Sequence, residues 1–176
     1  MKKTLISMGM AVMTAIPCFA QGINVPAFEF EVKTGTNYPL NDHSDTCNKL
    51  GVSIGLESRW NMKHLPMDIG AELYLGSAIK HDSNGGELCN RTFSIAFISD
   101  YQFKRGSNVS PYFGLGLGVA RCEHIKRGGG EEGTSPCIIP RVGLKLFRHF
   151  CLVIDAYINK KNYSHAGLTV GYSFHK

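Results

Sequence analysis

Charged residues share the glycine-rich faces of alternating segments along this chain, and ion pairing is the chemistry that they could do. Neighbouring polar positions hold small residues such as Gly114, Gly116 and Gly118, which offer almost no side chain to water. Small residues suit a crowded interior, where a charge must be paired or hydrated. The alternative is a solvated outer face on which the same charges have no common role. We predict a lumenal charge network that consists of Glu57, Arg59, Glu72, Asp100, Arg141, Lys145 and Asp155.

Cysteines offer a second chemistry, because an exported chain permits disulfide bonds. Cys47, Cys89, Cys122 and Cys137 fall in or beside the three longest polar connections. Cys122 and Cys137 flank one glycine-rich stretch, so their bridge is the preferred pairing and leaves Cys47 to join Cys89. Four cysteines allow three connectivities, and the other two stay open. Cys151 is expected at the opposite rim as a free thiol, beyond the reach of a disulfide bond.

The histidines give little support for metal or catalytic chemistry. His43, His81 and His124 lie in the same polar connections, but their spacing matches no tetrahedral ligand motif. Ser164 and His165 are adjacent near the same rim, and no spacing in the chain reproduces a known nucleophile arrangement. We therefore expect no metal, no cofactor and no enzymatic activity.

Eight segments with a period of two must position these side chains. One face of each segment carries mainly Leu, Val, Ile or Phe, and the other carries glycine, hydroxylated or charged residues. Glycine recurs inside almost every apolar segment and would cost a helix about 1 kcal/mol each time, so the pattern indicates strands. The expected strands cover residues 28–33, 50–60, 67–76, 92–103, 112–120, 141–146, 152–159 and 165–174.

The connections between these segments alternate in length. Short turns on one rim and long loops on the other are typical of a membrane barrel, so we predict an eight-stranded antiparallel up-and-down transmembrane β-barrel. Because a period of two does not say which face points inward, the alternative is a secreted soluble lipocalin-like barrel that binds a small apolar ligand inside. The long connections are expected at 39–48, 80–91 and 121–135, and the short ones at 61–66, 104–110 and 148–150.

The composition favours a wall that faces lipid. Only 19% of the residues are charged, whereas ordinary soluble domains carry about a quarter. A barrel whose outer belt faces lipid needs charges only in its loops and, sparingly, in its lumen. Loss of Lys2 and Lys3 with an N-terminal leader would lower the formal net charge from +5 to +3, which is too small and scattered to indicate nucleic-acid binding.

The first residues have the pattern of an export signal. A basic start precedes an apolar run at residues 5–16, which is shorter than the roughly 20 residues of a membrane helix. Cys18 and Ala20 place small residues at the positions that direct cleavage. Acylation of Cys18 is an alternative that the preceding Pro17 disfavours. We expect a signal peptide at residues 1–20 and an outer-membrane β-barrel domain at residues 21–176.

Aromatic residues gather near the short-turn ends of the segments, where a membrane interface would hold an aromatic girdle. The closing segment, residues 168–174, alternates and ends on an aromatic residue. Together these features resemble small bacterial outer-membrane β-barrel proteins, the group of the OmpA-like transmembrane domain and OmpX. The resemblance covers residues 27–174, with the difference that His175 and Lys176 follow the final aromatic residue. The aromatic residues are Trp60, Tyr101, Phe103, Tyr112, Phe113, Phe150, Tyr172 and Phe174.

The resemblance implies a monomer in the bacterial outer membrane, with periplasmic turns and loops outside the cell. It implies a structural or surface-interaction role without enzymatic activity, and a packed lumen that conducts little or nothing. The expected partners are outer-membrane lipid and lipopolysaccharide, the barrel-assembly machinery, and a host or cell-surface ligand of the loops.

Overall fold

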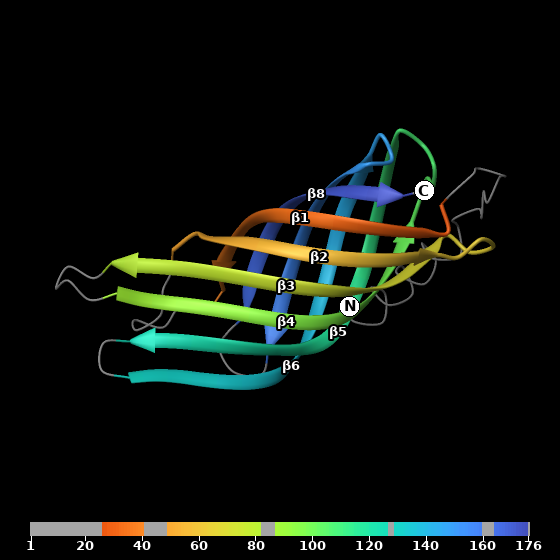
Figure 1. The fold of residues 1–176 in the computed structure, drawn as a ribbon. Coiled ribbons are helices and arrows are strands. Elements are labelled where there is room, and N and C mark those ends of the chain that lie inside the picture. Colours follow the sequence, from red (N-terminus) through yellow and green to blue (C-terminus); the bar gives the residue numbers. More distant parts are fainter. Residues whose placement is uncertain (1–25, 41–48, 82–86, 127–128, 160–163, 176) are drawn as a thin grey trace, which may run out of the picture.

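The chain forms one closed barrel of eight antiparallel strands, in which each strand pairs with its neighbour in the sequence and β1 pairs with β8 (Figure 1). This computed structural model describes residues 26–40, 49–81, 87–126, 129–159 and 164–175. The proposed signal peptide, His43 and Cys47 lie outside these ranges. No helix among the described residues could cross a membrane. The strands are β1 (Phe28–Pro39), β2 (Gly51–Asn61), β3 (Met67–His81), β4 (Glu87–Gln102), β5 (Val109–Lys126), β6 (Gly129–Leu146), β7 (Phe150–Asn159) and β8 (His165–His175).

The fold class predicted from the alternation is therefore confirmed. Successive side chains of a strand point to opposite faces, and here the apolar face points outward. In β2, Val52 is 70% exposed and Trp60 is 51% exposed, while Glu57 and Arg59 are each 1% exposed. A lipocalin-like barrel would need the opposite arrangement, with the Leu, Val and Ile face lining the cavity, so the structure does not favour that alternative.

Four strands are longer than the sequence pattern predicts. β3, β4, β5 and β6 contain 15, 16, 18 and 18 residues, so that strand occupies most of the expected loops at 80–91 and 121–135. Those two loop predictions are wrong, because the backbone pairing continues to His81–Glu87 and to Lys126–Gly129 although both faces become polar. Polar side chains do not interrupt a strand whose N–H and C=O groups are paired.

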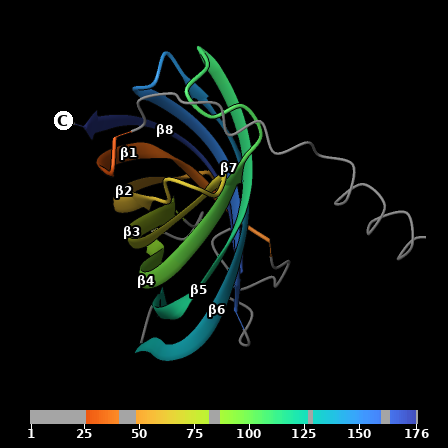
Figure 2. The same ribbon diagram turned by 90° about the vertical axis from the view of Figure 1, so that its right-hand side faces the viewer.

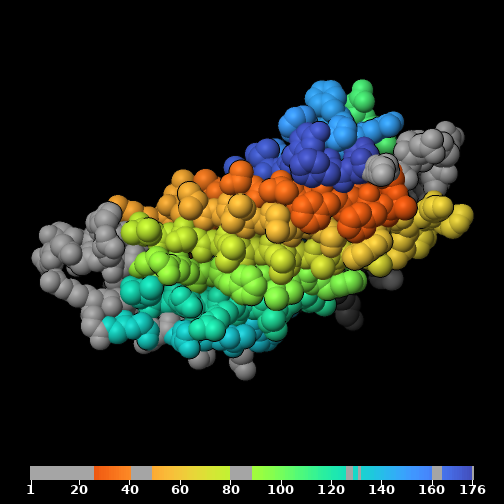
Figure 3. Space-filling model, viewed as in Figure 1, coloured from red at the N-terminus to blue at the C-terminus, as the bar shows by residue number. Residues whose placement is uncertain are grey.

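The long strands project beyond the rest of the barrel (Figure 1). β2 pairs with β3 only as far as Ser77, and β6 pairs with β7 only from Cys137 onward. Beyond these points a four-stranded sheet continues, which we call the loop-end sheet (residues 78–81, 87–90, 124–126 and 129–131). Figure 2 shows the strong curvature of the wall, and Figure 3 shows the strands side by side as a continuous outer surface.

Candidate functional site

A buried ion-pair network lies in the middle of the lumen, where β1, β2, β3 and β6 each contribute one charged side chain. Lys33 Nζ lies 3.2 Å from Glu57 Oε2 and 2.6 Å from Glu72 Oε2. Arg141 joins the same two carboxylates, with Nη2 3.0 Å from Glu57 Oε2 and Nη1 3.0 Å from Glu72 Oε2. None of these side chains is more than 1% exposed. Two cations and two carboxylates therefore balance one another inside the barrel, as buried charges require.

Arg59 extends this network toward the short-turn end. Its guanidinium pairs with Glu57 and lies 3.4 Å from Glu31 Oε2 and 3.7 Å from Asp100 Oδ2. The ring of Tyr112 lies beneath the guanidinium, with its centroid 5.2 Å from Arg59 Cζ, a distance suited to a cation–π contact. Asp100 also lies 3.4 Å from Arg141 Nε and so links the two arginines.

Two smaller clusters close the lumen at the short-turn end. Lys145 pairs with Glu29, which also accepts a hydrogen bond of 3.0 Å from Asn61 Nδ2. Beside them, the carboxylate of Asp68 accepts hydrogen bonds from Arg105 and from Gln102.

Stacked rings fill the lumen toward the loop end. The Tyr157 ring stacks on His165 at 4.5 Å between centroids and contacts Tyr74 at 4.4 Å. The Tyr157 hydroxyl donates a hydrogen bond to Glu72 and so joins the rings to the ion pairs. His165 is thus a buried lumenal residue, while Ser164 Oγ accepts a hydrogen bond from the backbone nitrogen of Asn159 at 3.2 Å.

The structure places all seven charged residues singled out in the sequence inside the barrel. Lys145 belongs to the separate cluster with Glu29, and the two Asp155 carboxylate oxygens have no hydrogen-bond partner among the described residues. Sequence reasoning missed Lys33, although its place on the same face of β1 as two glutamates was a usable signal. The five that meet in one network are Glu57, Arg59, Glu72, Asp100 and Arg141.

The described cysteines are buried free thiols that lie in strands: Cys89, Cys122, Cys137 and Cys151. Cys122 faces Gly133 and Cys137 faces Gly118, so the expected Cys122–Cys137 pair is offset along the β5–β6 hairpin and is not bonded. The offset follows from the extension of β5 and β6 through the expected loop. Cys89 is also free, and its proposed partner Cys47 lies outside the described residues.

The aromatic residues near the short-turn end lie on the outer wall, with one exception. Tyr101, Phe103 and Phe113 contact one another with centroids 5.5 to 5.6 Å apart. The prediction that Tyr112 belongs to the aromatic girdle is wrong. Its position in the alternation turns the side chain into the lumen, where the residue is 2% exposed.

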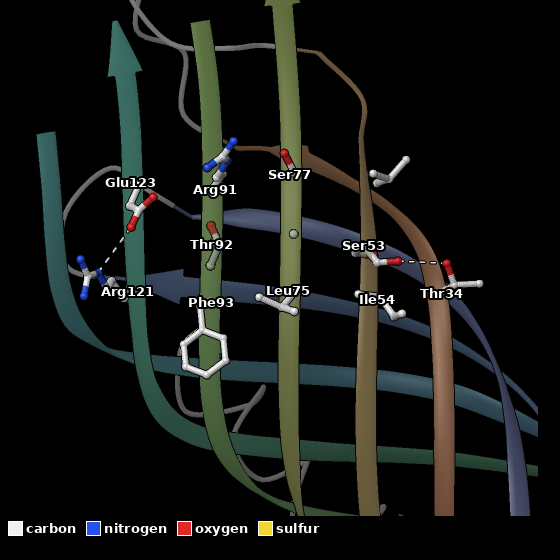
Figure 4. A pocket seen from close by; sticks show the side chains of 12 residues that line it. Thr34, Ser53, Ile54, Leu75, Ser77, Arg91, Thr92, Phe93, Arg121 and Glu123 are labelled. Carbon is white, nitrogen blue, oxygen red and sulfur yellow. Dashed lines mark hydrogen bonds and ion pairs between the residues drawn. The ribbon is translucent and has the colours of Figure 1, made fainter. Parts of the chain in front are cut away.

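A groove of about 500 Å³ crosses the outer wall near the loop end (Figure 4). Apolar side chains such as Ile54, Leu75 and Phe93 line one part, and the Arg91 and Arg121 side chains line the part on β4 and β5 (Figure 4). The groove therefore combines an apolar surface with guanidinium groups on the outer side of the barrel.

Comparison with known proteins identifies the fold. No protein-family model matches the sequence, and no curated protein matches it. Among solved structures, Neisserial surface protein A superimposes with a TM-score of 0.65 at 15% identity, covering 85% of this chain and 97% of that chain. Ail of Yersinia pestis gives 0.56 at 14% identity, covering 85% and 100%. OprG of Pseudomonas aeruginosa gives 0.54 at 12% identity, covering 89% and 99%. The chain thus has the fold of the small eight-stranded outer-membrane β-barrel proteins, the group that its sequence resembles.

Proposed function

We propose that the protein is a non-enzymatic integral outer-membrane β-barrel protein with a structural or surface-interaction role, whose loops face the outside of the cell. The observation that carries the proposal is the inverted distribution of polarity. Apolar side chains cover the outer wall, and charged side chains are paired in the lumen. In water such a wall would expose an apolar area far larger than the few hundred Å² typical of a soluble monomer.

The filled lumen supports a structural role rather than transport. Ion pairs occupy its middle, and stacked Tyr74, Tyr157 and His165 occupy the loop-end part. An eight-stranded barrel is just wide enough for side chains to fill it, so conduction should be negligible.

The loop-end sheet supports a role in surface interaction. Its paired backbone extends beyond the part of the wall that eight strands share. On the outside of the cell, this sheet would be the part of the protein nearest to a host or cell-surface ligand.

The groove on the outer wall supports lipopolysaccharide as a lipid partner. Its apolar part matches an acyl chain. Arg91 makes no ion pair with another residue that the structure describes, and it is placed to meet a phosphate. Arg121, in contrast, is held by Glu132 at 2.5 Å and by Glu123 at 3.6 Å. We further propose that residues 1–20 direct export and that the alternating strand β8 is recognised by the barrel-assembly machinery.

Fractionation of expressing cells tests the membrane location. We expect the protein to remain in the outer-membrane fraction after an alkaline wash and to need detergent for extraction. Release into the periplasmic or culture fraction without detergent would overturn the proposal. In planar bilayers the purified barrel should give no stable open channel, and deletion of the gene should leave the lipid profile unchanged.

A further inference from the structure

The three short turns form a surface whose charged residues are all cations. We call this the turn-end surface (residues 62–66, 103–108 and 147–149). Lys63, Lys104 and Arg148 are exposed there, and none of the residues in the three turns is Asp or Glu. Glu29 and Asp68, whose carboxylates lie at the same end of the lumen, are buried and paired. No acidic side chain of the three turns therefore compensates the exposed cations.

Hydrogen bonds hold the three turns together as one surface. Arg105 Nη1 donates to the backbone oxygens of Met62 at 2.5 Å and Leu65 at 2.8 Å, so the second turn is fastened to the first. The backbone nitrogen of Phe147 donates to the oxygen of Asn108 at 2.8 Å, which fastens the third turn to the second. The cations are thus presented from a fixed framework rather than from independent loops.

The cations lie directly beside the aromatic girdle. Lys63 lies three residues after Trp60 in the sequence, and Trp60 packs against Phe28 with ring centroids 5.3 Å apart. Lys104 follows Phe103, a member of the exposed aromatic cluster. Aromatic girdles mark the boundary between hydrocarbon and water, and lysine side chains extend from that boundary toward the headgroups. The cations therefore lie at the depth of lipid phosphates.

The opposite end of the barrel carries charges of both signs. Arg121 is paired there with Glu132 and Glu123, so its charge is already compensated. The turn end differs because none of the charged residues in its three turns is acidic, and the charge complement of such a surface is an anionic lipid headgroup.

We propose that the turn-end surface binds the headgroups of anionic phospholipids in the leaflet next to it. The proposal rests on the proposed function, since the barrel must lie in a membrane. Each basic residue near a membrane surface contributes about a fivefold preference for anionic lipid. We expect the lipids around the turn end to be enriched about two- to fivefold in anionic headgroups.

Trp60 is the one tryptophan of the chain and reports on these lipids without any mutation. The barrel is refolded into vesicles of equal parts phosphatidylglycerol and phosphatidylcholine, in which one or the other lipid carries brominated acyl chains that quench tryptophan. We expect brominated phosphatidylglycerol to quench Trp60 about two- to fivefold more effectively, and the ratio to fall to about one in high salt. Equal quenching at low salt would overturn the proposal.

Matched variants show which end of the barrel causes the preference for anionic lipid. Lys63→Gln with Lys104→Gln should lower the quenching ratio toward one, because only Arg148 of the three exposed cations remains. Lys49→Gln with Arg121→Gln, at the other end, should leave the ratio unchanged. An equal fall of the quenching ratio in both variants would overturn the proposal. The measurement in high salt uses the unmodified protein, so it tests the proposal even if a variant does not refold. If neither brominated lipid quenches Trp60, the barrel is not in the bilayer and the proposed function itself fails.

Discussion

Replacement of Arg141 by methionine should strongly destabilise the barrel, because Arg141 joins three carboxylates at the centre of the lumen. It lies within ion-pair distance of Glu57, Glu72 and Asp100, and its side chain is 1% exposed. Methionine matches the length of the aliphatic part but removes the charge. The remaining lumenal cations would then face an excess of buried carboxylates.

The magnitude follows from burial. Removal of one partner from a buried ion pair costs about 3–5 kcal/mol, because the other charge stays buried without compensation. Arg121→Met provides the matched control, since Arg121 lies 2.5 Å from Glu132 but its side chain is 54% exposed. Exposed ion pairs contribute about 0–1 kcal/mol, so this variant should be nearly as stable as the unmodified protein.

Urea unfolding of the refolded barrel, followed by the fluorescence of Trp60, measures both variants. A loss of about 3 kcal/mol moves the midpoint by about 1 M or more. Glu57→Gln combined with Arg141→Met should recover part of the loss, because the double variant removes a charge of each sign. Equal stability of Arg141→Met and Arg121→Met, or no recovery in the double variant, would refute the assignment of the lumen as a compensated charge network.

Three further predictions concern the turns, the wall and the thiols. Phe147 and Arg148 have positive φ angles of 50° and 66°, so Phe147→Asn with Arg148→Gly should raise the free energy of unfolding by about 1 kcal/mol in the same urea assay. Gly118→Ala should lower the free energy of unfolding by about 1–3 kcal/mol, since a Cβ there would lie 2.6 Å from the backbone Cα of Ala96. Gly116→Ala is the control and should cost less, because its Cβ would meet only side chains at 3.0 Å or more. Equal urea midpoints for the two variants would contradict this prediction. A water-soluble maleimide should not label the four buried thiols in the folded barrel and should label all of them after unfolding without reductant: Cys89, Cys122, Cys137 and Cys151. Failure to label Cys122 and Cys137 after unfolding would indicate a disulfide bond between them.

The alternation of side chains was enough to predict the barrel and its inner face. Glu57 and Arg59 are separated by one residue and flanked by Leu56 and Trp60, so their place inside follows once the outer face is assigned to lipid. The ends of the strands could not be predicted in the same way. Between Cys122 and Cys137 mainly polar residues and glycine occupy both faces. Only the pairing of backbone groups distinguishes a strand from a loop there, and residue type does not reveal that pairing.

Partners within the lumen were beyond the sequence for a different reason. Lys33 and Glu72 are 39 residues apart and meet because β1 and β3 are both neighbours of β2 in a closed barrel. Such contacts depend on the register of each strand pair and on the curvature of the wall. The same face of β1 also carries Glu29 and Glu31, so residue type alone does not say which of them joins the central network.

The lumenal charges also specify the register that brings them together. A slip of one residue between β1 and β2 would exchange the two faces of a strand, because side chains alternate with a period of two. In the proposed membrane location, Glu57 and Arg59 would then face hydrocarbon, and Leu56 and Trp60 would enter the lumen. A charged residue in the middle of a membrane costs several kcal/mol, and it would also lose its partners in the network. The ion pairs inside the barrel and the apolar belt outside it therefore select the same pairing of strands, which is why a sequence with few charged residues can still specify a single barrel.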